Sequence, residues 1–114
     1  MGRVVLVVDD DSAVLGLIAD MLEDLGCEVI CASNGTDALA VLVRDQRIEI
    51  LITDINMPGI AGYELADKAK SMRHRLNAIL LSGRESDSHG FPMIRKPFLQ
   101  DDLRRVMKET IGLC

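Results

Sequence analysis

Acidic, hydroxyl and amine side chains follow four separate, mostly apolar stretches of this chain. They are Asp9, Asp10, Asp54, Ser82 and Lys96. If the stretches are strands of one parallel sheet, these side chains meet at its carboxyl edge. Carboxylates gathered there repel one another unless a cation lies between them, and Mg²⁺ prefers carboxylate and carbonyl oxygens. The pattern predicts a Mg²⁺ site at Asp9, Asp10, Asp54 and the backbone carbonyl of Asn56, with Mn²⁺ as the alternative ion.

The same side chains are suited to phosphoryl transfer. A cation and Lys96 keep Asp54 ionised, so that its carboxylate can attack a phosphorus atom. They also neutralise the charge that spreads over the phosphoryl oxygens, and Ser82 can donate a hydrogen bond to one of these oxygens. The residues therefore predict an aspartyl phosphate at Asp54.

Apolar runs typical of strands alternate with segments that have the 3.6-residue period of helices. We expect strands over residues 4–8, 28–32, 48–54, 78–81 and 93–95, and helices over residues 12–25 and from Thr36, Gly62 and Leu99 onward. Asp11 and Ser12 are assigned to the cap of the first helix, Gly26 to its end and Thr36 to the cap of the second. This alternation predicts a doubly wound parallel sheet with helices on both faces.

The connection between the last two strands departs from this alternation. Residues 83–92 number only ten, are mostly polar, end in Gly and Pro, and have no helical period. A parallel crossover that carries a helix needs about 10–12 residues or more. We expect an extended loop here in place of a helix.

Length and composition restrict the class of protein. A chain of 114 residues, of which 48% are hydrophobic, indicates a single domain over residues 1–114. Its net charge of −5 argues against nucleic acid or an anionic membrane as a partner. No apolar run approaches the roughly 20 residues of a membrane span. Three cysteines do not form a disulfide framework, so we expect reduced thiols in a cytoplasmic protein.

Four motifs occur in a familiar order at the ends of the expected strands. They are residues 7–11 (VVDDD), 54–62 (DINMPGIAG), 81–83 (LSG) and 96–98 (KPF). In these motifs, which span almost the whole chain, the sequence resembles the receiver domains of two-component response regulators.

The resemblance implies a flavodoxin-like fold with strand order 2-1-3-4-5. It also implies that Asp54 is the phosphoacceptor, that Asp9 and Asp10 hold Mg²⁺ together with Asp54 and the Asn56 carbonyl, and that Ser82 and Lys96 respond to the phosphoryl group. The phosphoryl donor is then a phosphohistidine on a sensor kinase or a phosphotransfer protein. A cis peptide before Pro97 is implied as well.

Two positions depart from the family pattern, and a third has two interpretations. Met93 occupies the place where receivers usually have an aromatic switch residue, and a flexible thioether cannot make the same ring flip. The missing helix in residues 83–92 would otherwise form much of the output face and of a phosphorylation-dependent dimer. Arg84 lies where the family tunes the lifetime of the phosphoryl group, although a solvated loop arginine explains it equally well.

Two other functions compete with a phosphorylated signalling switch, which is itself not a conventional turnover enzyme. A phosphatase of the haloacid dehalogenase type would use Asp9 and Asp11 as its Asp-x-Asp motif, but it needs a further acidic pair beyond the lysine segment. A receiver-like interaction module would act independently of phosphate, which Met93 and the short connection favour. The sequence does not name the kinase, the pathway or the downstream partner.

Overall fold

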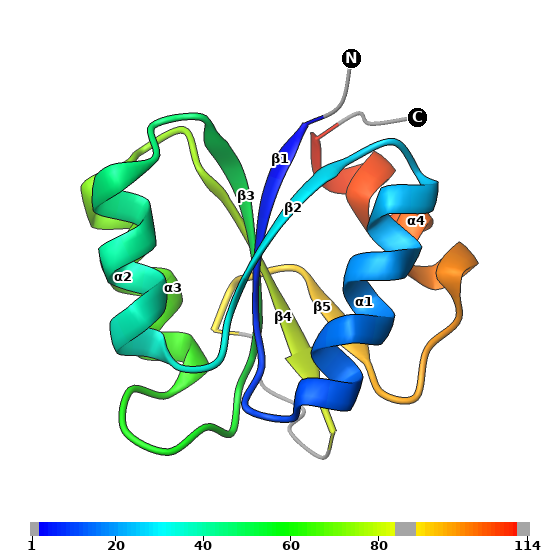
Figure 1. The fold of residues 1–114 in the computed structure, drawn as a ribbon, viewed down its shortest axis with the longest axis horizontal. Coiled ribbons are helices and arrows are strands. Elements are labelled where there is room, and N and C mark those ends of the chain that lie inside the picture. Colours follow the sequence, from blue (N-terminus) through cyan, green and yellow to red (C-terminus); the bar gives the residue numbers. More distant parts are fainter. Residues whose placement is uncertain (1–2, 84–88, 112–114) are drawn as a thin grey trace.

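The computed structural model describes residues 3–83 and 89–111. Its strands are β1 (Val4–Val8), β2 (Glu28–Ala32), β3 (Ile48–Asp54), β4 (Asn77–Ser82) and β5 (Met93–Arg95). Its helices are α1 (Ser12–Asp24), α2 (Gly35–Arg44), α3 (Gly62–Met72) and α4 (Gln100–Ile111). The strands form one parallel sheet in the order β2-β1-β3-β4-β5, with α1 and α4 on one face and α2 and α3 on the other (Figure 1). The predicted fold and strand order are confirmed.

The apolar strands divide their side chains between two hydrophobic clusters. In β1, Leu6 and Val8 pack into the cluster beneath α2 and α3, whereas Val5 and Val7 pack into the cluster beneath α1 and α4. This two-residue alternation within a run that is apolar throughout is the pattern of a strand buried on both faces. The packed layers fix the carboxyl ends of the inner strands at one edge.

The first helix is capped at Asp11 and ends before Gly26, as its sequence predicts, but the capping role predicted for Ser12 is wrong. The Asp11 side chain accepts hydrogen bonds from the N–H groups of Ala13 at 3.0 Å and Val14 at 3.4 Å, so Asp11 is the N-cap. Ser12 is the first helical residue and does not cap. At the other end Gly26 has a φ of +90°, a left-handed conformation that glycine adopts at little cost.

The cap predicted for the second helix is wrong by two residues. Asn34, in extended conformation, is the N-cap of α2, and its side-chain oxygen accepts the Asp37 N–H at 2.8 Å. Thr36 already lies inside the helix. Asn and Thr both cap helices, but the Asn34 amide also donates to the Asp37 carboxylate at 3.1 Å. This reciprocal pair fixes the start of the helix at Gly35.

The connection between β4 and β5 is short, and the helix expected in most doubly wound folds is reduced here. Among its described residues, 83 and 89–92, none is helical, in agreement with the sequence prediction. The His89 ring stacks on Tyr63 of α3 with their centroids 3.8 Å apart, and Phe91 packs against the hydrophobic cluster on that face. Arg84 lies outside the described residues.

The described helices include no segment that is long and apolar enough to span a bilayer.

The cap at Asn34 can be tested by its contribution to stability. Replacing Asn34 with Ala removes the acceptor for the Asp37 N–H and should lower the free energy of unfolding by about 1 kcal/mol. Replacing the exposed, helical Thr36 with Ala should leave stability unchanged or raise it slightly, because Ala is the better helix former. Urea denaturation of both variants measures the difference, and a larger loss at Thr36 would restore the assignment made from the sequence.

Candidate functional site

Four strands deliver the predicted site residues to the carboxyl edge of the sheet. Asp9 directly follows β1, Asp54 ends β3, Ser82 ends β4 and Lys96 directly follows β5. The Lys96 ammonium lies 3.1 Å from Asp9 Oδ2 and 3.3 Å from Asp54 Oδ1. Residues separated by up to 87 positions in the sequence thus meet at one cationic nitrogen.

Asp54 is held by one of its two carboxylate oxygens. Its Oδ1 accepts the Ile55 N–H at 3.0 Å and faces Lys96, while no hydrogen bond among the described residues engages Oδ2. The side chain is only 13% exposed. Burial raises the pKa of the Asp54 carboxyl, and the negative charge of Asp9 raises it further. The positive charge of Lys96 lowers it but does not cancel these effects, so the pKa is raised overall. The negative charge of Asp54 is therefore unfavourable in the metal-free fold, and a further cation would stabilise it.

Asp9 connects the site to the start of α1. This carboxylate is 1% exposed and accepts the Asp11 N–H through Oδ1 at 2.9 Å, while its Oδ2 accepts from Lys96. A carboxylate this deeply buried is stable only when it is paired and hydrogen-bonded. Asp9 thus orients the turn in which Asp11 caps the helix, a second role that the sequence analysis did not assign to it.

Lys96 is positioned by its backbone as well as by its charge. The peptide bond between Lys96 and Pro97 is cis, as the family resemblance implied, and the Lys96 N–H donates to the Ser82 carbonyl at 2.6 Å. Burial alone would lower the pKa of Lys96. The hydrogen bond to Asp9 and the charges of Asp54 and Asp9 outweigh that effect and raise it. The amine therefore stays protonated and cationic.

The carboxylates at this edge have the arrangement of a cation site. Asp9, Asp10 and Asp54 each present an oxygen, and these oxygens lie within 4.8 Å of one another. Asp10 is exposed, so the cluster opens to solvent on its side. Three carboxylates gather here, and Lys96 pairs with only two of them, which leaves net negative charge on oxygen donors of the kind that Mg²⁺ prefers. The residues present fit a divalent cation.

The remaining predicted residues differ in how deeply they are buried and in where they lie along their strands. Asn56 is exposed in the turn directly after β3, and the Ser82 side chain is fully buried at the end of β4. Met93 begins β5, where it pairs with Leu80 and packs against the α2–α3 cluster. It is therefore a partly buried residue behind the carboxyl edge and not a member of it.

Gly62 determines how closely α3 approaches the end of β3, where Asp54 lies. Its N–H donates to the Ile55 carbonyl at 2.9 Å, and a Cβ added at this position would lie 2.8 Å from Ile55 Cα and closer still to the Asp54 carbonyl oxygen. Only glycine fits there without a shift of the backbone that carries Asp54. The sequence shows this glycine at the helix start but contains no signal of the close approach.

A flavodoxin-like sheet of this order, with an acidic cluster and a lysine at its carboxyl edge, defines the class of CheY-like receiver domains. The chain belongs to the family of response regulator receiver domains, whose model matches residues 5–108.

Curated relatives include segments of much longer sensor proteins. The virulence sensor protein BvgS of Bordetella pertussis is 49% identical over 67 residues, which cover 59% of this chain and 5% of that protein. The sensor histidine kinase RcsC of Escherichia coli is 40% identical over 68 residues, which cover 60% of this chain and 7% of that protein. The chain thus spans less than a tenth of either relative.

Solved structures share the fold over nearly the full chain. A response regulator receiver domain protein from Clostridium thermocellum matches with a TM-score of 0.89 and 28% identity, covering 96% of this chain and 94% of that one. The receiver domain of sensor histidine kinase PA1611 from Pseudomonas aeruginosa, with magnesium coordinated in its active-site cleft, has a TM-score of 0.87 and 24% identity. That match covers 98% of this chain and 99% of the other and shows the common fold.

Removing the Asp54 charge should stabilise the metal-free fold. Because the pKa of Asp54 is raised in the folded state above 3.8, ionisation of this group lowers the free energy of unfolding as the pH rises past that value. In the Asp54→Asn variant the amide oxygen can still accept the Ile55 N–H, and Lys96 keeps its pair with Asp9. In EDTA at pH 7, we expect this variant to unfold at a higher urea concentration than the wild type.

Mg²⁺ should reverse the order of the two urea midpoints, so that the wild type unfolds at the higher concentration. A cation present at 100 times its dissociation constant stabilises the protein that binds it by about 2.7 kcal/mol. Asp67→Asn, a change at an exposed acid of α3, serves as the control and should leave both midpoints unchanged. An Asp54→Asn midpoint below the wild type in EDTA would contradict the raised pKa.

The close approach at Gly62 predicts a large cost for one methyl group. Gly62→Ala should lower the free energy of unfolding by about 1–3 kcal/mol, because the added Cβ overpacks against the backbone of Asp54 and Ile55. Gly16→Ala is the matched control, since a Cβ at this position of α1 meets nothing within 4 Å. It should stabilise the fold by about 0.5–1 kcal/mol. Equal effects of the two substitutions would show that the contact at Gly62 is not tight.

Proposed function

We propose that this receiver domain is a phosphoacceptor in a phosphorelay and takes a phosphoryl group from a phosphohistidine onto Asp54. The observation that carries the proposal is the Lys96 ammonium lying 3.1 Å from Asp9 and 3.3 Å from Asp54 at the carboxyl edge of the sheet. This arrangement supplies a nucleophile and a fixed positive charge beside it.

In the proposed step, Asp54 Oδ2 attacks the phosphorus atom and the bond between phosphorus and the donor imidazole nitrogen breaks. The electron pair of the broken bond returns to the imidazole nitrogen. Lys96 offsets charge on the phosphoryl oxygens, and the Ser82 hydroxyl donates a hydrogen bond to one of them. Attack of water on the same phosphorus later breaks its bond to Asp54 Oδ2, releases inorganic phosphate and restores the carboxylate. The chain thus carries out its own phosphorylation and dephosphorylation without being a conventional turnover enzyme.

A divalent cation belongs to this proposal. Mg²⁺ held by Asp9, Asp10, Asp54 and the Asn56 carbonyl would supply a positive charge for the phosphoryl oxygens, and Mn²⁺ could replace it. The gathered carboxylates of this chain and the magnesium in the receiver domain of PA1611 support the choice.

The proposed donors are sensor histidine kinases or histidine phosphotransfer proteins, because sensor kinases are among the relatives of the chain. Phosphorylation would then change its interaction with a downstream protein or output domain, and a phosphorylation-dependent dimer stays a prediction. We place this exchange in the cytoplasm. Met93 and Arg84 stay predicted modulators of the switch.

Of the rival functions, an interaction module independent of phosphate is favoured by one observation, the reduced connection between β4 and β5. The phosphatase alternative is not favoured. Asp11, the second acid of its Asp-x-Asp motif, is occupied as the N-cap of α1 through its Oδ1.

Incubation with acetyl phosphate and Mg²⁺, followed by intact mass spectrometry, tests the function directly. We expect one phosphoryl adduct on the wild type, none in EDTA and none on Asp54→Asn. Lys96→Ala should slow its formation by about 100-fold, because a fixed charge beside the transferred group is lost.

Absence of an adduct on the wild type would favour the interaction module, and an adduct on Asp54→Asn would refute the site. Steady turnover of p-nitrophenyl phosphate that is lost in Asp9→Asn but kept in Asp54→Asn would instead identify a phosphatase.

A further inference from the structure

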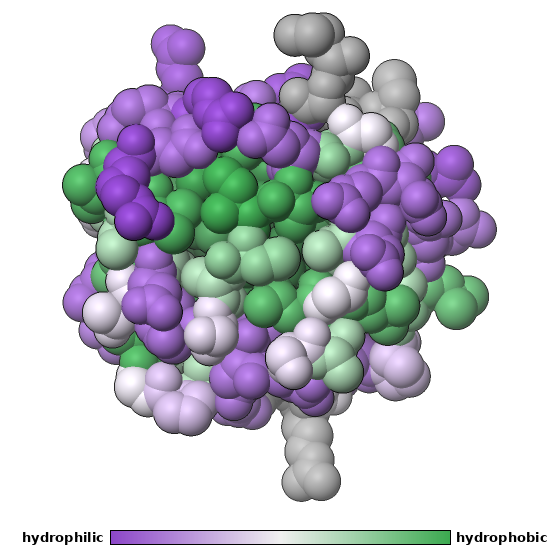
Figure 2. Space-filling view, in the orientation of Figure 1, coloured by the Kyte–Doolittle hydropathy of each residue, from purple (hydrophilic) through white to green (hydrophobic). Residues whose placement is uncertain are grey.

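A second concave site lies at the amino edge of the sheet, opposite the carboxyl edge that carries Asp54. Its volume is about 570 Å³, within the range of small-molecule pockets. It lies where β1, β3 and β4 begin, and its lining includes Arg3, Gln46, Glu49, Arg73, Arg75 and Asn77. Figure 2 shows hydrophilic surface crowding this end of the molecule, at the top of the view.

The charge of this cavity is opposite in sign to that of the whole chain. Three arginines line it against a single carboxylate, Glu49, which Arg3 neutralises at 2.6 Å. Two arginines, Arg73 and Arg75, therefore remain in excess in a chain of net charge −5. A cleft lined by one sign of charge concentrates ions of the other sign.

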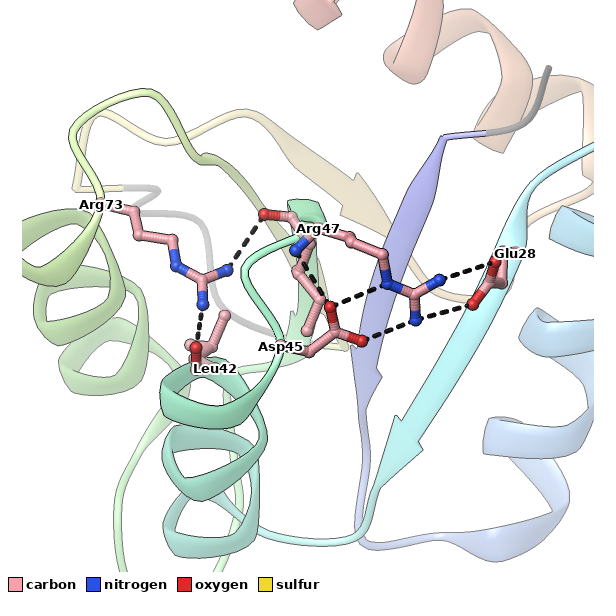
Figure 3. Close-up of polar contacts among 6 residues, drawn as sticks. Glu28, Leu42, Asp45, Arg47 and Arg73 are labelled. Atoms are coloured by element: carbon pink, nitrogen blue, oxygen red, sulfur yellow. Dashed lines mark hydrogen bonds and ion pairs between the residues drawn. The ribbon is translucent and has the colours of Figure 1, made fainter.

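Arg73 is held in place by partners that leave its charge intact. Its guanidinium donates to the backbone carbonyls of Leu42 and Ile48, as the close-up shows (Figure 3). Three hydrogen bonds from Arg47, two from its guanidinium and one from its backbone N–H, hold the pKa of Asp45 down at about 2 (Figure 3). The Arg73 charge contributes a smaller part of this lowering, but the ion pair of Asp45 is with Arg47, and no salt bridge joins Arg73 to a carboxylate among the described residues.

Arg75 is exposed and makes no ion pair or hydrogen bond within residues 3–83 and 89–111. Helix capping does not account for it, because Lys70 already donates to the carbonyls of His74 at 3.1 Å and Leu76 at 2.7 Å beyond the end of α3. The guanidinium of Arg75 is therefore available to an anion that enters the cavity.

We propose that this cavity binds a small organic phosphate of about nucleotide size. Arg75 offers the forked donors that match phosphate oxygens, and Arg73, whose terminal nitrogens already donate to two backbone carbonyls, adds a fixed positive charge. The amides of Gln46 and Asn77 can hydrogen-bond to the polar groups of the ligand, and Leu76 supplies an apolar floor. The site is separate from Asp54 and requires no metal ion.

Titration of the full chain with ATP in EDTA and low salt tests the proposal, with backbone amide shifts followed by NMR. EDTA prevents a metal ion from bridging ATP to the acidic cluster. We expect saturable shifts at Arg3 and residues 73–77, with a dissociation constant below about 1 mM. Binding should weaken as salt is added, because the interaction is between exposed charges.

Arg75→Ala should weaken ATP binding by about 10-fold, and Arg75→Glu should abolish it. Arg104→Ala is the charge-matched control, because Arg104 is an exposed arginine paired with Asp101 on α4. It should leave binding unchanged. Both Arg75 variants should still form the acetyl phosphate adduct, so this proposal and the phosphoacceptor function can fail independently.

Titrations with pyrophosphate, citrate and hexaglutamate test which class of anion the cavity binds. Pyrophosphate should bind at the same amides, and the two carboxylate ligands should bind at least about 10-fold more weakly than ATP. The proposal is overturned if ATP causes no saturable shifts, if Arg104→Ala weakens binding as much as Arg75→Ala, or if hexaglutamate binds more tightly. The last result would assign the surface to an acidic polypeptide.

Discussion

The whole carboxyl edge depends on one shared ammonium ion. Lys96 stands between the carboxylates of Asp9 and Asp54, which would otherwise repel each other in a poorly solvated place. One cation cannot balance the three acids gathered there, and the raised pKa of Asp54 is a direct sign of the remaining excess. The metal-free fold therefore carries excess negative charge at this edge, and a cation that removed this excess would also supply the positive charge that the proposed phosphoryl transfer needs.

The sequence contained most of the information about this edge, for a simple topological reason. In a parallel sheet all strands end on the same side, so a list of the residues that follow apolar runs is already a list of neighbours. Asp9, Asp54, Ser82 and Lys96 could be brought together in this way without coordinates. The loop in place of a helix before Met93 could also be predicted from the sequence, because a crossover that carries a helix needs a minimum number of residues.

What the sequence could not show depends on distances rather than on order. Asn34 and Thr36 are both good capping residues, and only the geometry of the Asp37 N–H distinguishes between them. Gly62 looks like any glycine at a helix start until the path of the Asp54 backbone beneath it is known. The cavity at the amino edge is lined by residues from three separate segments, and its charge emerges only when they are assembled.

The start of β1 and the end of α4 determine where a joined polypeptide would leave the domain. β1 begins and α4 ends at the same end of the molecule, away from Asp54 (Figure 1). Any polypeptide joined at either side would therefore leave from that end of a body that measures 32 × 31 × 26 Å. A domain tethered there would raise the local concentration of the receiver near its neighbours without covering Asp54.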